Sequence, residues 1–96
     1  PFDVVVVEID AHKNEKIRNF SSHIYEELKQ LGLDVMLDDR NSKLGSKLYD
    51  WELIGIPNII IIGKTEADKS EVTFRTRGSS DKSSIKLDEL INILIT

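Results

Sequence analysis

The apolar and polar residues of the 96-residue chain divide it into short segments with two different periodicities. Residues 2–9 and 58–62 contain the β-branched runs 4–7 and 59–62, which show no polar alternation and are typical of strands buried on both faces. Between them, residues 14–31 carry apolar side chains every three or four positions, which predicts an amphipathic helix. Gly32 follows directly, and we expect it to end this helix in the left-handed conformation.

The rest of the pattern predicts two more strands and two more helices. Residues 33–37 form a short apolar segment, and residues 71–77 alternate between apolar and polar side chains, as in a strand with one exposed face. A second helix is expected over residues 44–53, with Ser42 as its N-cap. A final helix is expected over residues 86–95, where apolar side chains again recur at helical spacing.

Glycine, proline and serine mark the connections between these elements. Gly55 and Pro57 end the second helix, because glycine permits a left-handed turn and proline cannot continue a helix. The polar segments 63–70 and 78–84 are interpreted as a turn and a serine-rich loop. The resulting order, β-α-β-α-β-β-α, predicts an α/β fold with a mixed sheet between helices and right-handed crossovers in its first connections.

Composition is that of one globular domain, with 40% hydrophobic and 31% charged residues. The longest apolar run, residues 59–62, is far too short to cross a membrane, so we expect no membrane partner. The absence of cysteine excludes disulfides and thiolate zinc sites, which suits a cytoplasmic protein.

The net charge of −4 argues against a general polyanion binder, but the charges are unevenly placed. Residues 1–39 hold nine acids and four bases, whereas residues 75–86 hold four bases and one acid. Salt screens charges beyond about 10 Å, so a basic strip on an acidic body can still attract a phosphate chain. Any contact with a nucleic acid should therefore be confined to one face.

Residues 38–57 combine charge, glycine and the only tryptophan of the chain, Trp51, where a predicted strand ends and a helix begins. Open α/β sheets bind ligands at such places. Lys47 and Trp51 are four residues apart, so they share a helix face. They could simply pack, with the lysine over the indole. Alternatively, the lysine could meet a phosphate, the indole an unpaired base, and the Glu52 carboxylate the Watson–Crick edge of guanine.

Other chemistries fit these residues less well. A magnesium site built on Asp38 and Asp39 would need a further carboxylate closing the central strand, and that strand closes on Gly63 instead. We expect no metal site; the simpler expectation is that Asp38 caps the turn and that Asp39 pairs with Arg40 or a nearby base.

Phosphate-loop and catalytic motifs are also not supported. The segment 63–65, Gly-Lys-Thr, lacks the glycine that a phosphate-binding loop requires at position 58, which is asparagine. His12 lies just before the first predicted helix and His23 lies within it, and neither has a recognisable nucleophile. We therefore predict no catalytic residue in this chain.

Three short motifs in the sequence together resemble those of a known family. They are Asp38-Asp39-Arg40, the Gly-x-Lys of residues 45–47 and the Glu-Leu-Ile-Gly-Ile-Pro of residues 52–57, and residues 72–77 continue the match. This pattern resembles the anticodon-binding domain of class II aminoacyl-tRNA synthetases, and within it most resembles prolyl-tRNA synthetase. A threonyl or histidyl enzyme, or a protein-interaction module that reuses the fold, remains the alternative.

The resemblance implies a three-layer α/β/α fold with a mixed, mostly parallel five-stranded sheet. It implies that residues 1–96 are one domain, excised from the C-terminal end of a larger cytoplasmic, homodimeric synthetase. That domain would bind the anticodon loop of tRNA, with proline tRNA as the expected partner, without a cofactor of its own. ATP, Mg²⁺ and the charging reaction would belong to a separate catalytic domain.

The resemblance also implies an RNA-binding set. Glu52 is expected to read guanine, and Lys47, Arg77 and Lys82 to contact phosphates or base edges, with Arg40 and Trp51 as further candidate contacts. Leu48 stands where relatives often have phenylalanine, so any stacking surface would have to come from Tyr49 or Trp51.

Overall fold

The computed structural model describes residues 2–79 and 81–95 and contains one five-stranded sheet. Its strands are β1 (Val4–Glu8), β2 (Val35–Asp38), β3 (Asn58–Ile62), β4 (Glu71–Thr76) and β5 (Ser83–Lys86). Their order across the sheet is β2-β1-β3-β4-β5. β1 pairs in parallel with β2 and β3, while β4 pairs antiparallel with β3 and β5. Only β4 therefore runs against the others, and the predicted mixed, mostly parallel sheet is confirmed.

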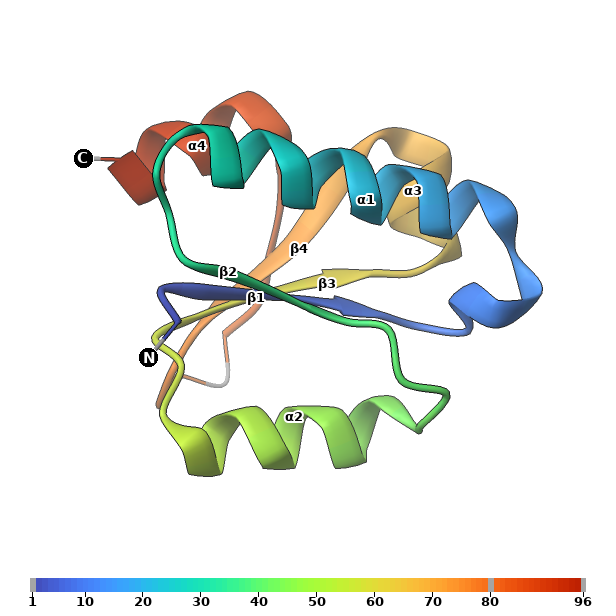
Figure 1. Cartoon of the computed structure of the whole chain (residues 1–96), viewed down its shortest axis with the longest axis horizontal. Coiled ribbons are helices and arrows are strands. Elements are labelled where there is room, and N and C mark those ends of the chain that lie inside the picture. Colours follow the sequence, from blue (N-terminus) through green and yellow to red (C-terminus); the bar gives the residue numbers. More distant parts are fainter. Residues whose placement is uncertain (1, 80, 96) are drawn as a thin grey trace.

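The helices cover the two faces of the sheet unequally. They are α1 (Glu15–Gln30), α2 (Leu44–Ile54), α3 (Lys64–Lys69) and α4 (Leu87–Ile95), with a short 3₁₀ turn at Ala11–Lys13. Figure 1 shows α1, α3 and α4 on one face and α2 alone on the other. This is the expected three-layer arrangement, and the apolar core beneath α2 is formed by β1 and β3 with Met36 of β2.

The core lies on both sides of β1 and β3. Val4, Val6, Ile60 and Ile62 face the larger helical layer, and the alternate residues of the same strands face α2. Every residue of β1 is buried, which explains why its sequence shows no polar alternation. Each fully buried valine or isoleucine contributes about 1.5–3 kcal/mol relative to an exposed one.

The predicted ends of α1 and α2 are largely as observed. The Asn14 side chain accepts hydrogen bonds from the backbone of Lys16 and Ile17 at 3.0 and 3.3 Å, which fixes the start of α1. Gly32 and Gly55 have φ angles of +87° and +90°, as expected after the two helices. The Ser42 prediction is wrong, since the N-cap of α2 is Lys43 and its side chain makes no capping hydrogen bond.

Two polar segments are more ordered than their sequences indicate. Residues 64–69, predicted as part of a turn, form α3, which buries only Ala67. Residues 83 and 84, predicted as loop, begin β5 because they pair with β4. Position 80 of the predicted loop lies outside the described residues. Neither segment has enough apolar residues to show a periodicity.

No helix in the described part of the chain is long and apolar enough to cross a membrane.

Candidate nucleic-acid interface

Lys47 is buried at the junction where β1 and β2 end and α2 begins. Its side chain is 2% exposed, and its ammonium group donates to the backbone carbonyls of Glu8 at 2.8 Å and Asp38 at 3.2 Å. The Asp38 carboxylate lies 3.8 Å away. The ammonium group therefore ties α2 to two parallel strands. It does not reach the surface, so this geometry does not support the expected phosphate contact of Lys47.

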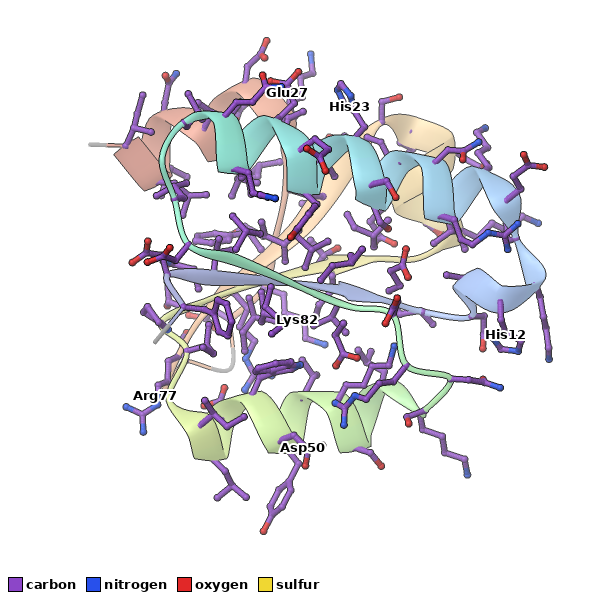
Figure 2. The ribbon with its side chains drawn as sticks, viewed as in Figure 1. His12, His23, Glu27, Asp50, Arg77 and Lys82 are labelled. Atoms are coloured by element: carbon purple, nitrogen blue, oxygen red, sulfur yellow. The ribbon has the colours of Figure 1, made fainter. Side chains whose placement is uncertain are left out.

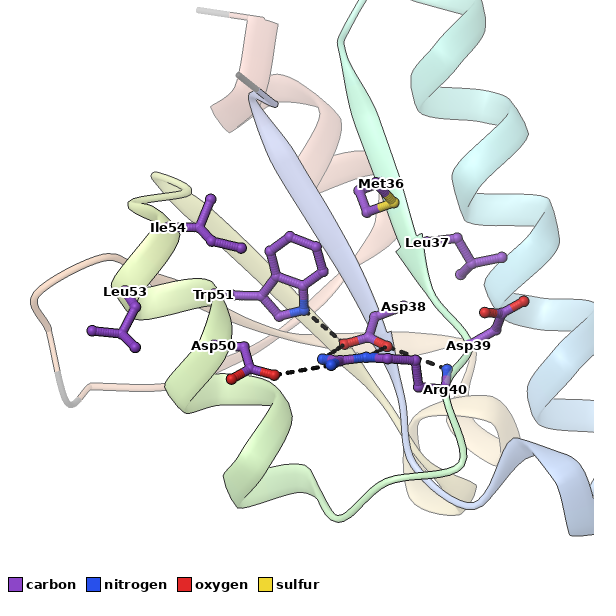
Figure 3. Close-up of a pocket in the computed structure, with 9 residues that line it drawn as sticks. All are labelled: Met36, Leu37, Asp38, Asp39, Arg40, Asp50, Trp51, Leu53 and Ile54. Atoms are coloured by element: carbon purple, nitrogen blue, oxygen red, sulfur yellow. Dashed lines mark hydrogen bonds and ion pairs between the residues drawn. The ribbon is translucent and has the colours of Figure 1, made fainter.

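The Asp38 carboxylate is the hydrogen-bond acceptor for donors from several elements around this junction. It accepts hydrogen bonds from Trp51 Nε1 at 2.7 Å and from Arg40 Nε and Nη2 at 2.9 and 2.8 Å. Arg40 also donates to Asp50 at 2.9 Å. The expected Asp39–Arg40 pair is thus replaced by Asp38–Arg40, because the Asp38 side chain points toward α2 and the guanidinium bridges it to Asp50 (Figure 3).

These contacts shift the pKa values of both partners. Burial by itself raises the pKa of Asp38, but the hydrogen bonds from Arg40 and Trp51 together outweigh it and lower the pKa from 3.8 to about 2. The hydrogen bonds to Asp38 and Asp50 raise the pKa of Arg40. Asp38 is therefore a carboxylate at every physiological pH, and Arg40 is held by two acids at the surface.

Trp51 is part of the core beneath α2. It is 9% exposed and packs with Val5, Val7 and Ile59. This supports the packing interpretation of the Trp51 side chain and leaves little of the indole for an unpaired base. Lys47 does not lie over the ring as expected, since its ammonium group is used by the strand carbonyls. The exposed aromatic of α2 is Tyr49, at 66%.

Glu52 lies on another side of α2, next to β4. Its carboxylate is 3.0 Å from Arg75 Nη2, and the Arg75 Nε donates to the carbonyl of Ser79 at 2.8 Å. Both side chains of this ion pair are partly exposed, at 28% and 19%. Arg75 thus connects the last turns of α2 to the loop that follows β4.

Arg77 and Lys82 border the same surface. Val72 and Phe74 face the larger helical layer, so alternation places Arg75 and Arg77 on the α2 side of β4. Figure 2 shows Arg77 and Lys82 on this side of the sheet, and both are exposed. The Arg77 Nε lies 3.5 Å from the Glu52 carbonyl oxygen.

Gly55 forms the turn beside Arg77. Its φ of +90° is the left-handed conformation that favours glycine, and a Cβ there would lie at an ordinary contact distance of 3.6 Å from the Arg77 guanidinium carbon. Arg77, Glu52, Gly55 and Pro57 line an open hollow of about 500 Å³ at the end of α2. The hollow offers one carboxylate and one exposed guanidinium, groups that can pair with base edges and phosphates.

The two histidines are placed far from this surface. His23 lies 3.8 Å from Glu27 on the outer face of α1, and His12 is in the 3₁₀ turn at the other end of the sheet (Figure 2). Within residues 2–79 and 81–95, no three histidine, aspartate or glutamate side chains gather as metal ligands.

Comparison with protein families decides the class of domain. The family model described as "Anticodon binding domain" matches residues 3–96. The chain belongs to this family. A structure of the RNA binding domain of threonyl-tRNA synthetase from Cryptosporidium parvum has a TM-score of 0.88, with 26% identity over 99% of this chain and 23% of that chain.

A second structure, of prolyl-tRNA synthetase from the same organism, shares the fold. Its TM-score is 0.87, with 24% identity over 99% of this chain and 22% of that chain. This anticodon-binding domain therefore spans less than a quarter of each of those chains. The two neighbours carry different amino-acid names, so the domain class is settled and the particular enzyme is a separate question.

In this anticodon-binding domain, the predicted RNA-binding residues fall into two groups. Glu52, Arg77 and Lys82 border the α2 side of β4 and β5. Lys47 and Trp51 are buried around Asp38, and the exposed Arg40 is bound to Asp38 and Asp50. Sequence reasoning did not select Arg75, which pairs with Glu52. The available signal was the alternation of arginine with Val72 and Phe74, which places bases on one face of a strand.

Proposed function

We propose that this domain binds the anticodon loop of a tRNA as part of a class II aminoacyl-tRNA synthetase, with prolyl-tRNA synthetase the favoured enzyme. The observation that carries the proposal is the family match over residues 3–96, joined to a basic surface beside an acidic side chain at the end of α2. This surface includes the open hollow of about 500 Å³ at the end of α2, into which part of an RNA loop could fit.

The charges of this surface suit a single-stranded loop. Arg77 and Lys82 are exposed and can approach phosphates, although the whole chain has a net charge of −4. Glu52 can accept hydrogen bonds from N1–H and N2–H₂ of guanine, and Arg75 holds its carboxylate in place. Proline anticodons end in two guanines, so an acidic reader favours the prolyl enzyme.

Three other functions are alternatives to the prolyl-tRNA synthetase domain. The threonyl enzyme is supported by the structure that is 26% identical. The histidyl enzyme shares the domain class, and a protein-interaction module would use the fold without charging tRNA. In the favoured case, ATP, Mg²⁺ and the charging reaction belong to a catalytic domain of a longer, homodimeric, cytoplasmic protein.

Titration with anticodon stem-loops tests whether the domain recognises the proline anticodon. The domain is mixed with labelled stem-loops of proline, threonine and histidine tRNAs at two salt concentrations, and anisotropy is recorded. We expect the proline loop to bind most tightly and all binding to weaken with salt, because phosphate contacts release counterions. Equal affinity for the three loops would contradict the prolyl assignment, and tighter binding of the threonine loop would replace it.

Glu52→Ala is expected to reduce the preference for guanine over adenine at the contacted position by about 1–3 kcal/mol, the usual contribution of a good bidentate base contact. The measurement compares stem-loops with single base changes. Glu26→Ala, an exposed acid on α1, is the matched control and should leave the preference unchanged. A Glu52→Ala domain that discriminates like its parent would remove Glu52 as the reader.

Arg77→Ala is expected to weaken binding of all stem-loops by a similar factor and to lower the slope of log affinity against log salt by about 1 if it contacts a phosphate. Lys64→Ala removes the same charge from α3, on the other face of the sheet, and should change the slope much less. Equal effects of the two variants would show that only net charge matters and that Arg77 makes no specific contact.

A further inference from the structure

An apolar groove lies on the β2 side of α2, away from the surface proposed for RNA. It has a volume of about 530 Å³ and runs between β2 and the second half of α2. Met36, Trp51, Leu53 and Ile54 form its apolar walls, and Asp39 and Asp50 lie at its polar end (Figure 3). The proposed RNA contact uses none of these side chains.

Two of the residues that form the apolar walls are largely exposed to solvent. Leu53 and Ile54 are 67% and 63% exposed, and Tyr49 on the same helix is 66% exposed. α2 therefore carries apolar side chains toward the solvent as well as toward the sheet. Contiguous apolar surface beside a groove marks an interaction site more often than isolated exposed side chains do.

β2 supplies a second, independent feature. It is the edge strand of the sheet formed by the described residues and pairs only with β1. The outward main-chain groups of an edge strand can pair with an extended polypeptide. An added strand beside β2 would place alternate side chains into the groove toward Trp51 and Leu53.

The charge at the polar end indicates which polypeptide would fit. Asp38, Asp39 and Asp50 lie there with Arg40, whose guanidinium is already bound by Asp38 and Asp50, and the buried Lys47 ammonium group lies 3.8 Å from Asp38. Asp39 is exposed at the mouth of the groove. A lysine or arginine of the partner would meet this acidic end, whereas an acidic side chain would be repelled.

We propose that the groove between β2 and α2 binds an extended, basic–apolar polypeptide segment, which adds to the sheet beside β2. Its apolar side chains pack on Leu53, Ile54 and the partly exposed Met36, and a lysine or arginine lies beside Asp39. RNA and peptide would occupy different sides of α2, so both can be bound at once. The peptide site is independent of the RNA-binding proposal and stands or falls separately.

A labelled peptide of alternating residues, Lys-Val-Lys-Leu-Thr-Val, provides the probe. Its affinity for the domain is measured by fluorescence anisotropy, and the contacted residues are mapped by amide chemical shifts. We expect saturable binding, with the largest shifts at β2 and the Trp51 indole N–H. A peptide with glutamate in place of both lysines should bind at least tenfold more weakly, as should one with alternate backbone amides N-methylated.

Two variants of α2 make a matched pair. Leu53→Asp changes a groove wall and should weaken binding at least tenfold, while Tyr49→Asp, equally exposed but outside the groove, should change it less than twofold. Neither side chain is buried, so both variants should fold, and both should bind the proline stem-loop like the parent. Asp39→Lys should weaken the basic peptide and strengthen the glutamate peptide.

Several results would overturn the proposal. These are no saturable binding at millimolar peptide, equal binding of the N-methylated peptide, equal effects of Leu53→Asp and Tyr49→Asp, or shifts centred on Arg75 and Arg77. A dimer in sedimentation that Leu53→Asp dissociates would identify a second copy of the chain as the occupant instead. Failure of the parent domain to bind any stem-loop would contradict the RNA-binding proposal and would leave the peptide-binding proposal unchanged.

Discussion

Replacing Lys47 by alanine is expected to lower the free energy of unfolding by about 3–5 kcal/mol, because it removes one partner of a buried ion pair. The ammonium group donates to the carbonyls of Glu8 and Asp38 and lies near the Asp38 carboxylate. Alanine leaves these oxygens without that donor and opens a cavity along the buried side chain. The measurement is the urea unfolding midpoint, with the slope used to check that unfolding stays two-state.

Two other lysine variants make this result interpretable. Lys47→Met keeps most of the volume and removes the ammonium group, so it should lose less stability than alanine. Lys43→Ala changes an exposed lysine just before α2 and should alter the stability by no more than about 0.5 kcal/mol. A domain is stable by only about 5–15 kcal/mol, so the alanine variant is best measured with a stabilising osmolyte. Equal stability of Lys47→Ala and Lys43→Ala would contradict the buried role.

The methionine variant also tests whether Lys47 touches RNA. With the ammonium group buried, folded Lys47→Met should bind the proline stem-loop within twofold of the parent and with the same salt dependence. A lost phosphate contact would instead lower the salt slope by about 1. Such a drop in a folded variant would show that Lys47 leaves its buried position when RNA binds.

The sequence predicted the elements whose signal is local. β3 begins and ends as expected because four isoleucines follow Asn58 without interruption, and α1 lies between Asn14 and Gly32, which fix its ends. α3 and β5 have no such signal. The Glu66 carboxylate holds α3 in place by accepting from the Gly63 amide and the Thr73 hydroxyl, and β5 exists because β4 pairs with it. The Glu66 contacts reach only three and seven residues along the chain, and β5 pairs with the strand before it, but none of these contacts produces a hydrophobic periodicity in the sequence.

The contacts of the candidate site also could not be predicted from the hydrophobic pattern. That Lys47 and Trp51 share a face of α2 follows from their spacing, but the spacing does not say which face is buried. Leu53 and Ile54 are as apolar as the buried residues, so hydrophobic pattern alone could not orient the helix. Asp38 decides the orientation, since it accepts from Trp51 and compensates Lys47. The Glu52–Arg75 pair joins residues 23 positions apart, so the sequence pattern could not predict it either.

Asp38→Asn is expected to destabilise the domain by about 3–5 kcal/mol near pH 7, because it leaves the buried Lys47 ammonium without its anion and weakens the Arg40 pair. Asp50→Asn is the matched control. Asp50 binds the same guanidinium but is 44% exposed, so its loss should cost about 0–1 kcal/mol. Unfolding is followed by urea titration for both variants and the parent. Similar losses from the two variants would show that the buried contacts of Asp38 add nothing.

The pH dependence gives this prediction a sharper form. The pKa of Asp38 is about 2 in the folded domain, below its usual 3.8, so the folded state binds the proton more weakly than the unfolded state. The carboxylate therefore stabilises the domain above about pH 4, and this contribution is lost as the pH falls toward 2. At about 1.4 kcal/mol per pKa unit, the loss amounts to about 2 kcal/mol.

Subtracting the variant from the parent isolates this contribution from those of other acids. Glu8 acts in the opposite direction, because burial raises its pKa and protonation relieves that cost as the pH falls. Glu8 is present in both proteins, so it largely cancels. The stability difference between parent and Asp38→Asn should therefore shrink between pH 5 and pH 2. A ¹³C titration of the Asp38 carboxyl in the parent measures the same pKa without any substitution, and a value near 3.8 would refute the buried network as the source of acid sensitivity.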